Sequence, residues 1–127
     1  MRRAGAPSCS SSSAEHMRLF HITSRGEWED AQRSGEYRPR GFAREQFIHC
    51  SYAGQVVPVA NRFYKGVRDL VLLEIEPARL TCRVIEENLE GGSEQFPHVY
   101  GPLPVSAVAA VHAFPCDAEG TFAHPLE

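Results

Sequence analysis

The sequence lacks the features that mark membrane, secreted and nucleic-acid-binding proteins. No stretch approaches the roughly 20 consecutive apolar residues of a transmembrane helix, and the first 16 residues lack the apolar segment of a secretory signal. The net charge of -3 supplies no general attraction for nucleic acid or an anionic membrane. The composition therefore favours a cytoplasmic protein with no membrane anchor and no general nucleic-acid binding.

Cysteine is sparse, and its spacing excludes two common uses. The four cysteines are scattered with no C-x-x-C pair, so neither a zinc knuckle nor a dense disulfide framework is indicated. There is also no G-x-G-x-x-G motif and no P-loop, so the usual nucleotide-binding signatures are absent.

The 127 residues are enough for one globular domain with a core, because 43% of them are hydrophobic. Residues 1–16 are rich in serine and offer little to bury, so we expect a disordered tail there. We expect a single domain over 17–116 and a C-terminal tail over 117–127.

The first foldable segment predicts a strand followed by a capped helix. RLFHI indicates a strand over 18–22, and Ser24 with Glu27 fits an S-x-x-E capping box that begins a helix over 25–34. The face of this helix that carries Trp28 should pack on a sheet.

The remaining elements are mostly strands. EYRPRGFAREQ predicts a surface loop, and FIHCS predicts a short strand before a helix that Ser51 caps and that Pro58 kinks or restarts. DLVLLEIE is a continuous apolar run typical of a central strand. The order predicts an α+β fold with mixed or antiparallel pairing; three further strands are expected within 82–89, 95–101 and 108–114.

Three histidines occupy similar positions at or inside short strands: His21, His49 and His98. Imidazole titrates near neutrality and both donates and accepts hydrogen bonds, so histidines that share a pocket suit acid–base work or the binding of hydroxyls. Thr23 and Ser51 each follow a histidine by two residues and would share its face of a strand. Alternatively, the histidines are satisfied strand-end residues, and the two hydroxyls only start the helices that follow.

Other chemistries receive less support from the sequence. The histidines are 28 and 49 positions apart, with no H-x-H or H-E-x-x-H motif that would indicate zinc, so no metal site is expected. Cys50 should face the core if His49 faces a site. Glu74 and Glu76 share a strand face, where paired carboxylates suit glycoside hydrolysis but solvent-facing alternation also explains them.

Several motifs in order resemble a known family. HITSRGEWEDAQRSGEY, GFAREQFIHCS, VANRFYKG with DLVLLEIEPARL, and FPHVYGPLPVSAV look like the small bacterial family catalogued as domain of unknown function 952. The resemblance runs from about Met17 to Phe114. It implies a fold similar to the ADP-ribosyltransferase superfamily, near the histidine-rich branch that includes the RNA 2'-phosphotransferases: split, mostly antiparallel sheets with two main helices around a cleft for NAD or an ADP-ribosyl group.

The resemblance also implies roles for particular residues. His21 matches the first-strand residue that contacts the ribose beside nicotinamide, and His49 matches the histidine of the second motif. Two aromatics eleven positions apart sandwich the nicotinamide in related transferases, and Tyr52 and Phe63 have that spacing, although Phe63 is equally well explained as core. The implied catalytic residues are His21 and His49, and the implied ligand contacts are Thr23, Ser51, Tyr52, Phe63, His98 and Tyr100.

The third motif departs from the pattern of toxin-type transferases. Those enzymes use a late glutamate against the positive charge of the transition state, whereas FPHVYGPL supplies His98 and Tyr100. A neutral histidine does not provide that electrostatic stabilisation. Arg44 and Arg62 are candidates for a phosphate grip, because guanidinium matches phosphate geometry, although loop arginines are usually solvated.

Three functional hypotheses follow. The protein is an enzyme that transfers an ADP-ribosyl or ribose-phosphate group from NAD or a related nucleotide, a binding module for such a nucleotide without turnover, or a protein whose histidines are only structural. The two pocket hypotheses require the three histidines to lie close together.

Overall fold

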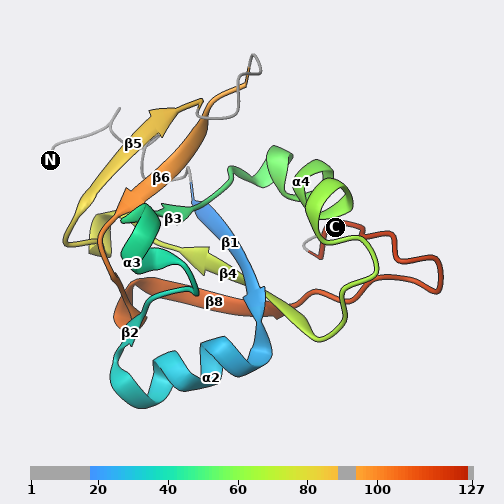
Figure 1. Cartoon of the computed structure of the whole chain (residues 1–127), viewed down its shortest axis with the longest axis horizontal. Helices are drawn as coiled ribbons and strands as arrows, with labels where there is room; N and C mark the ends of the chain where they lie inside the picture. The colour runs from blue at the N-terminus through green and yellow to red at the C-terminus, as the bar shows by residue number, and fades with distance from the viewer. Residues whose placement is uncertain (1–17, 89–93, 126–127) are drawn as a thin grey trace, which may run out of the picture.

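The chain forms two main antiparallel sheets, shown in Figure 1 by a computed structural model that describes residues 18–88 and 94–125. The first sheet has the order β1-β4-β8 and the second the order β3-β6-β5. Every strand pairing in them is antiparallel. The strands are β1 (Leu19–Ser24), β4 (Leu70–Ile75), β8 (Val108–Ala113), β3 (Ile48–His49), β6 (Phe96–Tyr100) and β5 (Arg83–Glu87).

The two sheets join at one point along the free edge of β1. The backbone N–H groups of Phe20 and Ser51 each donate to the other residue's carbonyl oxygen, both at 2.8 Å. Ser51 lies two residues past the end of β3, so this bridge holds the end of the second sheet against the middle of β1. We call this pair of hydrogen bonds the β1–β3 junction.

β4 is the central strand of the first sheet, as its apolar run predicts. Val71, Leu73 and Ile75 face one core cluster, whereas Leu70 and Leu72 face another on the opposite side. A strand that is covered on both faces needs apolar residues on both faces, which explains the apolar run from Leu70 to Leu73.

Helix α2 (Arg25–Ser34) has the predicted boundaries and packing. The Ser24 side chain accepts the Glu27 backbone N–H at 3.1 Å, and Trp28 and Ala31 are buried in the first core cluster. The helix ends at Gly35, whose φ of +92° is accessible to glycine at little cost. Ser24, rather than Thr23, is therefore the cap, which leaves the Thr23 hydroxyl for another contact.

Helix α4 (Val56–Phe63) follows a single 3-10 turn, η1 (Ala53–Gln55). Pro58 falls in the first turn of α4, where its missing N–H would have no helical partner, so the helix restarts instead of kinking. Ser51 makes no capping bond, because Tyr52 is the residue that precedes η1. The expected cap at Ser51 is therefore wrong.

The segment predicted as a loop contains two short elements. Its first residues form β2 (Glu36–Tyr37), which pairs with β7 (Leu103–Pro104), and α3 (Phe42–Glu45) follows. Tyr37 is buried, at 2% exposure. Two further 3-10 turns are η2 (Pro77–Arg79) and η3 (Val105–Ala107).

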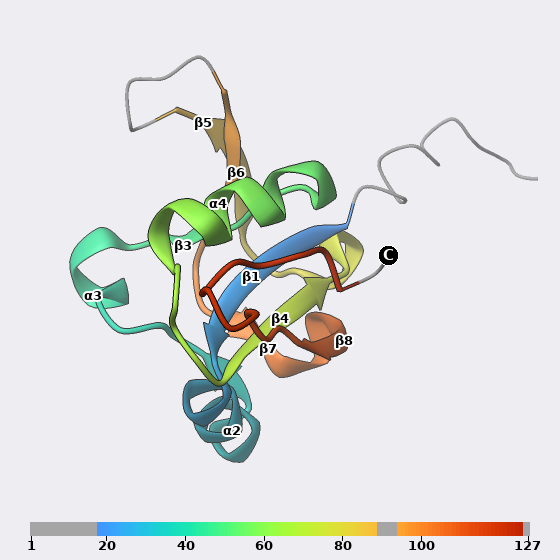
Figure 2. The ribbon, with the colours of Figure 1, turned by 90° about the vertical axis from the view of Figure 1, so that its right-hand side faces the viewer.

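The described part of the expected C-terminal tail packs on the domain. Phe122 is 3% exposed and its ring lies 4.9 Å from that of Phe114. The Asn61 side chain accepts the Phe122 backbone N–H at 2.8 Å, so this segment lies beside α4 over the same face of the sheet (Figure 2). The expected boundary at 116 is therefore wrong, because Phe122 completes a core cluster. The predicted tail over 1–16 lies outside the described residues.

No helix in residues 18–88 and 94–125 is long and apolar enough to cross a membrane.

Phe122→Ala should destabilise the protein by about 3 kcal/mol, because a Phe-to-Ala truncation in a core removes buried apolar area and leaves a cavity. Urea unfolding followed by circular dichroism measures the loss. Thr121→Ala, in the same segment at an exposed position, is the control and should change stability by less than about 0.5 kcal/mol. Equal stability of the two variants would mean that the C-terminal segment does not form part of the core.

Candidate functional site

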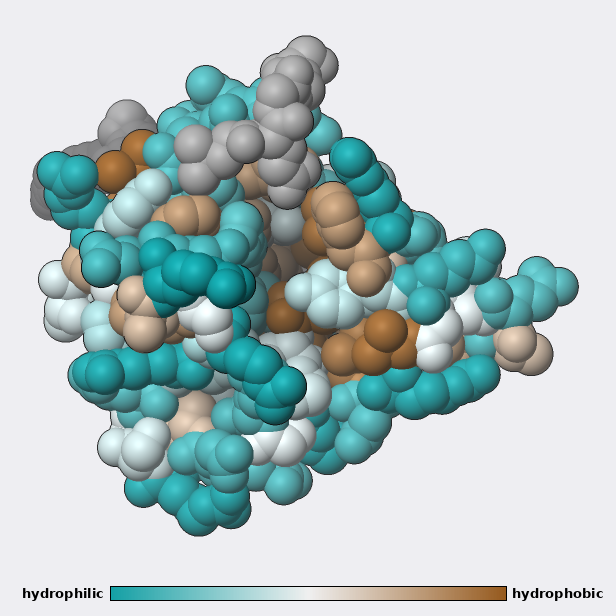
Figure 3. All heavy atoms as spheres, viewed as in Figure 1, coloured by the Kyte–Doolittle hydropathy of each residue, from teal (hydrophilic) through white to brown (hydrophobic). Residues whose placement is uncertain are grey.

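A pocket of about 610 Å³ lies at the β1–β3 junction, within the range of roughly 300–1,000 Å³ typical of small-molecule sites. β1, β3, β6, α4 and the segment around α3 supply its walls, and Figure 3 shows the hollow in the molecular surface. The residues around it are Phe20, His21, Ile22, Thr23, Ser24, Glu27, Tyr37, Pro39, Arg40, Glu45, Phe47, His49, Cys50, Ser51, Val59, Phe63, Tyr64, Val67, Leu70, Glu87, Phe96 and His98.

Six of the eight site residues proposed from the sequence line this pocket. The first sheet contributes two, the second sheet and the segment after β3 contribute three, and α4 contributes one. All three histidines are therefore brought together, as the pocket hypotheses require. The six are His21, Thr23, His49, Ser51, Phe63 and His98, whereas Tyr52 and Tyr100 are not in the lining.

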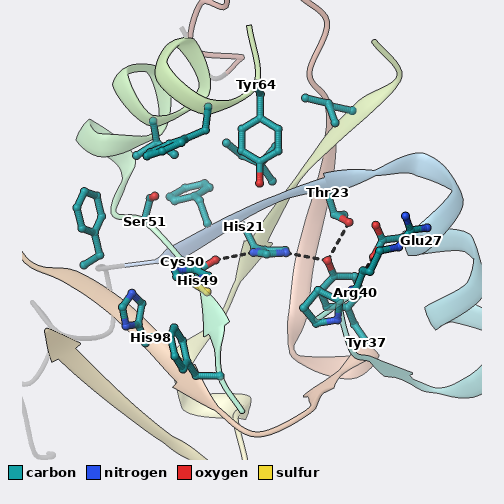
Figure 4. A pocket seen from close by; sticks show the side chains of 18 of the residues that line it. His21, Thr23, Glu27, Tyr37, Arg40, His49, Cys50, Ser51, Tyr64 and His98 are labelled. Atoms are coloured by element: carbon teal, nitrogen blue, oxygen red, sulfur yellow. Dashed lines mark hydrogen bonds between the residues drawn. The ribbon is translucent and has the colours of Figure 1, made fainter. Parts of the chain in front are cut away.

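His21 is held by hydrogen bonds at both ring nitrogens (Figure 4). Nδ1 lies 2.5 Å from the backbone oxygen of His49, and Nε2 lies 2.7 Å from the Tyr37 hydroxyl. The Tyr37 and Thr23 hydroxyls are 2.8 Å apart. These contacts form one chain from Thr23 on β1 to the backbone of β3.

The direction of each bond in this chain follows from His21. A carbonyl oxygen only accepts, so Nδ1 carries a proton and donates it to His49. Burial lowers the pKa of His21 to about 4, so at neutral pH Nε2 is unprotonated and accepts from Tyr37. The Tyr37 hydroxyl has one proton, which it donates to Nε2 of His21. The Thr23 hydroxyl must therefore be the donor in its bond with Tyr37.

His21 consequently has no free nitrogen for a ligand. A proton moves to or from its ring only if one of the two bonds breaks, which leaves a buried polar group unpaired. The expected proton-shuttle role of His21 is not supported by this geometry. Its ring instead fixes the His49 backbone next to β1.

His98 has one occupied nitrogen. Its Nδ1 lies 2.9 Å from a carboxylate oxygen of Glu87 on β5, and the Tyr100 hydroxyl donates to the same oxygen. These two hydrogen bonds lower the pKa of Glu87, with that from Tyr100 the larger cause. Phe47 stacks on the His98 ring with centroids 4.6 Å apart, so ring orientation is fixed from two sides.

Two polar atoms of the lining are buried and have no hydrogen-bond partner within residues 18–88 and 94–125. They are Oγ of Ser51 and Nε2 of His98, in residues that are 7% and 4% exposed. Buried polar groups are nearly always hydrogen-bonded to protein or water. Both atoms belong to residues that line the pocket, so both are available to a bound molecule.

The His49 side chain is half exposed and lies between other rings. Its ring centroid is 4.8 Å from that of Phe47 and 5.0 Å from that of His98. Its Nε2 is 3.6 Å from a Glu45 carboxylate oxygen, which is longer than a hydrogen bond. His49 therefore lines the pocket with an exposed ring, and its contact with the Glu45 carboxylate is a loose one.

The aromatic sandwich expected from Tyr52 and Phe63 does not form. The Tyr52 hydroxyl donates to Glu86 at 2.5 Å, and Glu86 alternates with Glu87 on β5 and faces away from the pocket. Phe63 does line the pocket and is 53% exposed, so the pocket has one accessible aromatic ring from this pair. Tyr52 is wrongly placed in the predicted site.

The predicted phosphate-binding arginines also lie elsewhere. Arg44 and Arg62 do not line the pocket, and the Arg62 guanidinium is over the Phe63 ring, 4.9 Å from its centroid. Arg40 is the one arginine in the described lining. The same lining contains three carboxylates, those of Glu27, Glu45 and Glu87.

Sequence reasoning missed Tyr37, Arg40, Tyr64 and Glu87. Tyr64 turns its hydroxyl into the pocket from the end of α4 (Figure 4). A signal for Glu87 was present: a hairpin over 82–101 pairs Ile85 with His98, and Glu87 shares the face of Ile85. Tyr37 gave no such signal, because β2 has only two residues.

The other chemistries considered from the sequence find little support. Cys50 is 3% exposed in the first core cluster, as predicted, and its burial raises the pKa of the thiol. Glu74 accepts hydrogen bonds from Arg18 and from His112, so it is held in a side-chain network instead of facing solvent freely. The part of the chain that the structure describes has no group of three or more potential metal ligands.

Comparison with known proteins gives a family but no activity. A family model described as "Protein of unknown function (DUF952)" matches residues 22–111. The crystal structure of protein CC0527 from Caulobacter crescentus is 33% identical and superposes with a TM-score of 0.75, over 84% of this chain and 93% of that one. The solution NMR structure of the same protein is 34% identical and superposes with a TM-score of 0.71, over 81% of this chain and 89% of that one. No curated protein matches the sequence.

The neutral state of His21 should make the protein sensitive to acid. Its folded pKa of about 4 lies below the usual 6.5, so between these values the unfolded chain binds a proton that the folded chain does not. Stability therefore falls as the pH drops through this window, by about 3 kcal/mol for this residue.

Denaturant unfolding of the wild type and of His21→Asn at pH 7, 6, 5 and 4 measures this contribution. Asparagine keeps an N–H donor near the His49 carbonyl and does not titrate. The variant should start less stable and lose less stability on acidification than the wild type. If the unfolding free energies of the wild type and of the variant fall equally with pH, His21 is not a buried, neutral histidine in the folded protein.

Proposed function

This chain belongs to the family of proteins of unknown function DUF952, and on that premise we propose that its pocket binds NAD or a related ADP-ribosyl nucleotide and acts on the bond between nicotinamide and ribose. The observation that carries the proposal is the β1–β3 junction. It places the H-x-T of β1, the H-x-S that begins in β3 and the histidine of β6 around one pocket, as the resemblance to the ADP-ribosyltransferase superfamily implies.

The lining offers a suitable partner for each part of such a ligand. The exposed ring of Phe63 provides a face on which a nicotinamide ring stacks. The Ser51 and Tyr64 hydroxyls are available to ribose or carboxamide groups. Among the described residues of the lining, Arg40 supplies the one guanidinium available to the diphosphate.

The charge of the lining favours the oxidised nucleotide. Three carboxylates face one arginine, so the site attracts the positive nicotinamidium ring of NAD more than the neutral ring of NADH. A carboxylate also stands beside the third motif. Glu87 on β5 supplies near this motif a negative charge that FPHVYGPL itself lacks.

A second candidate function is nucleotide binding without turnover. The observation that favours it is the full occupation of both His21 nitrogens, since a first-strand histidine so engaged orients the pocket but does not transfer a proton. A protein of this kind senses NAD instead of consuming it.

Isothermal titration with NAD, NADH and ADP-ribose tests the binding proposal. NAD should bind at least about fivefold more tightly than NADH at low salt, and 0.5 M NaCl should narrow the difference, because the discrimination is electrostatic. Nicotinamide release, followed by chromatography, separates the enzyme from the sensor. Undetectable binding of all three nucleotides would refute both candidate functions.

Arg40→Ala should weaken NAD binding about five- to tenfold, because it removes a charge-assisted contact with the diphosphate worth about 1–1.4 kcal/mol. Arg44→Ala is the matched control, since Arg44 is also an exposed arginine of this segment but does not line the pocket, and should leave the affinity within twofold. Equal affinities for both variants would exclude Arg40 as the phosphate contact.

A further inference from the structure

We propose that Glu87 and His98 form the acid–base pair of this pocket, with Glu87 as the positioning residue and Nε2 of His98 as the atom that takes a proton from a hydroxyl nucleophile. This assignment rests on the proposed function for its substrate. It moves the acid–base role from the first-strand histidine to a pair held within the second sheet.

The hairpin of β5 and β6 builds the pair. Ile85 lies opposite His98, and Glu87 lies two residues further on the same face of the sheet. The Glu87 carboxylate accepts from Nδ1 at 2.9 Å and from the Tyr100 hydroxyl. Because a carboxylate only accepts, Nδ1 must carry the proton, and in the neutral ring Nε2 keeps its lone pair.

The surroundings keep that lone pair available. His98 is 4% exposed, and its Nε2 has no hydrogen-bond partner in the described ranges 18–88 and 94–125. Phe47 stacks on the ring, and the His49 ring lies edge-to-face with it at a centroid distance of 5.0 Å. Figure 4 shows the His98 ring entering the pocket from β6, beside His49.

The other two histidines are less suited to this task. Both nitrogens of His21 are occupied by Tyr37 and the His49 backbone. The His49 ring is half exposed, and its nearest carboxylate, on Glu45, is 3.6 Å away. Among the three, only His98 combines a buried, oriented ring with a nitrogen that has no partner in the part of the chain that the structure describes.

The proposed step balances with water or an alcohol as nucleophile. The nucleophile's oxygen forms a bond to the ribose C1' of NAD while the bond from C1' to the nicotinamide nitrogen breaks. The electron pair of that bond leaves with neutral nicotinamide. The proton of the hydroxyl passes to Nε2 of His98, whose positive charge is stabilised by Glu87, and is then released to solvent.

Nicotinamide release and NAD affinity are measured together for four proteins: the wild type, His98→Gln, Glu87→Gln and Glu86→Gln. We expect His98→Gln to lower kcat about a hundredfold or more and Glu87→Gln at least about tenfold, with the dissociation constant of NAD within threefold in both. Glu86 is the matched control, because it is the adjacent carboxylate on the opposite face and bonds Tyr52. Full kcat in His98→Gln or Glu87→Gln, or NAD binding with no release by the wild type, would overturn the pair.

A second measurement does not depend on NAD. Nitrogen-15 NMR of the free protein reports which nitrogen of His98 carries the proton. The Nδ1–H tautomer is expected in the wild type and in Glu86→Gln, with a shift toward Nε2–H in Glu87→Ala. An Nε2–H tautomer in the wild type would overturn the pair even if NAD binds. The Nδ1–H tautomer without NAD binding would support the pair and refute the proposed ligand.

Discussion

The two hydrogen bonds between the backbones of Phe20 and Ser51 hold the second sheet against β1, and the pocket depends on them. The other edge of β1 pairs with β4 along its whole length. On this edge the described residues form only the Phe20–Ser51 bridge, so the two sheets separate beyond it and leave room for the pocket. His21 reinforces the contact by donating to the His49 carbonyl. A histidine that resembles a catalytic residue thus serves to fix the geometry of the residues around it.

Some polar groups in the pocket have all their hydrogen bonds made by the protein, and others do not. The first set holds the structure in place, and the second is available to a ligand. Thr23, Tyr37 and His21 complete one another's hydrogen bonds in a buried chain. Ser51 and His98 are buried residues of the lining, and each keeps one polar atom without a hydrogen-bond partner within residues 18–88 and 94–125. A polar network that is complete rigidifies its surroundings, whereas an isolated buried lone pair costs free energy unless a ligand or water meets it.

Capping residues and hydrophobic patterns predict many of the helices and strands but few of the residues that make up the pocket. Ser24 and Gly35 mark the ends of α2 because caps are local contacts, and the apolar run of β4 marks the central strand because both of its faces are buried. Tyr37 reaches the site through β2, which pairs with the distant strand β7. Glu87 reaches it through the register of the β5–β6 pair, which periodicity alone does not fix. Tyr52 was misassigned because spacing along the chain does not show to which side of η1 a ring turns.

The central claim is that the pocket at the β1–β3 junction holds the nicotinamide end of NAD. A proton–nitrogen correlation NMR titration of the full chain with NAD tests it most directly, because every backbone amide around the junction reports separately. The account predicts saturable shifts that concentrate at Thr23, Ser51, Phe63, Tyr64 and His98, with little change in α2 or β8. Saturating NAD that leaves these amides unmoved, or that shifts a different surface, would contradict it.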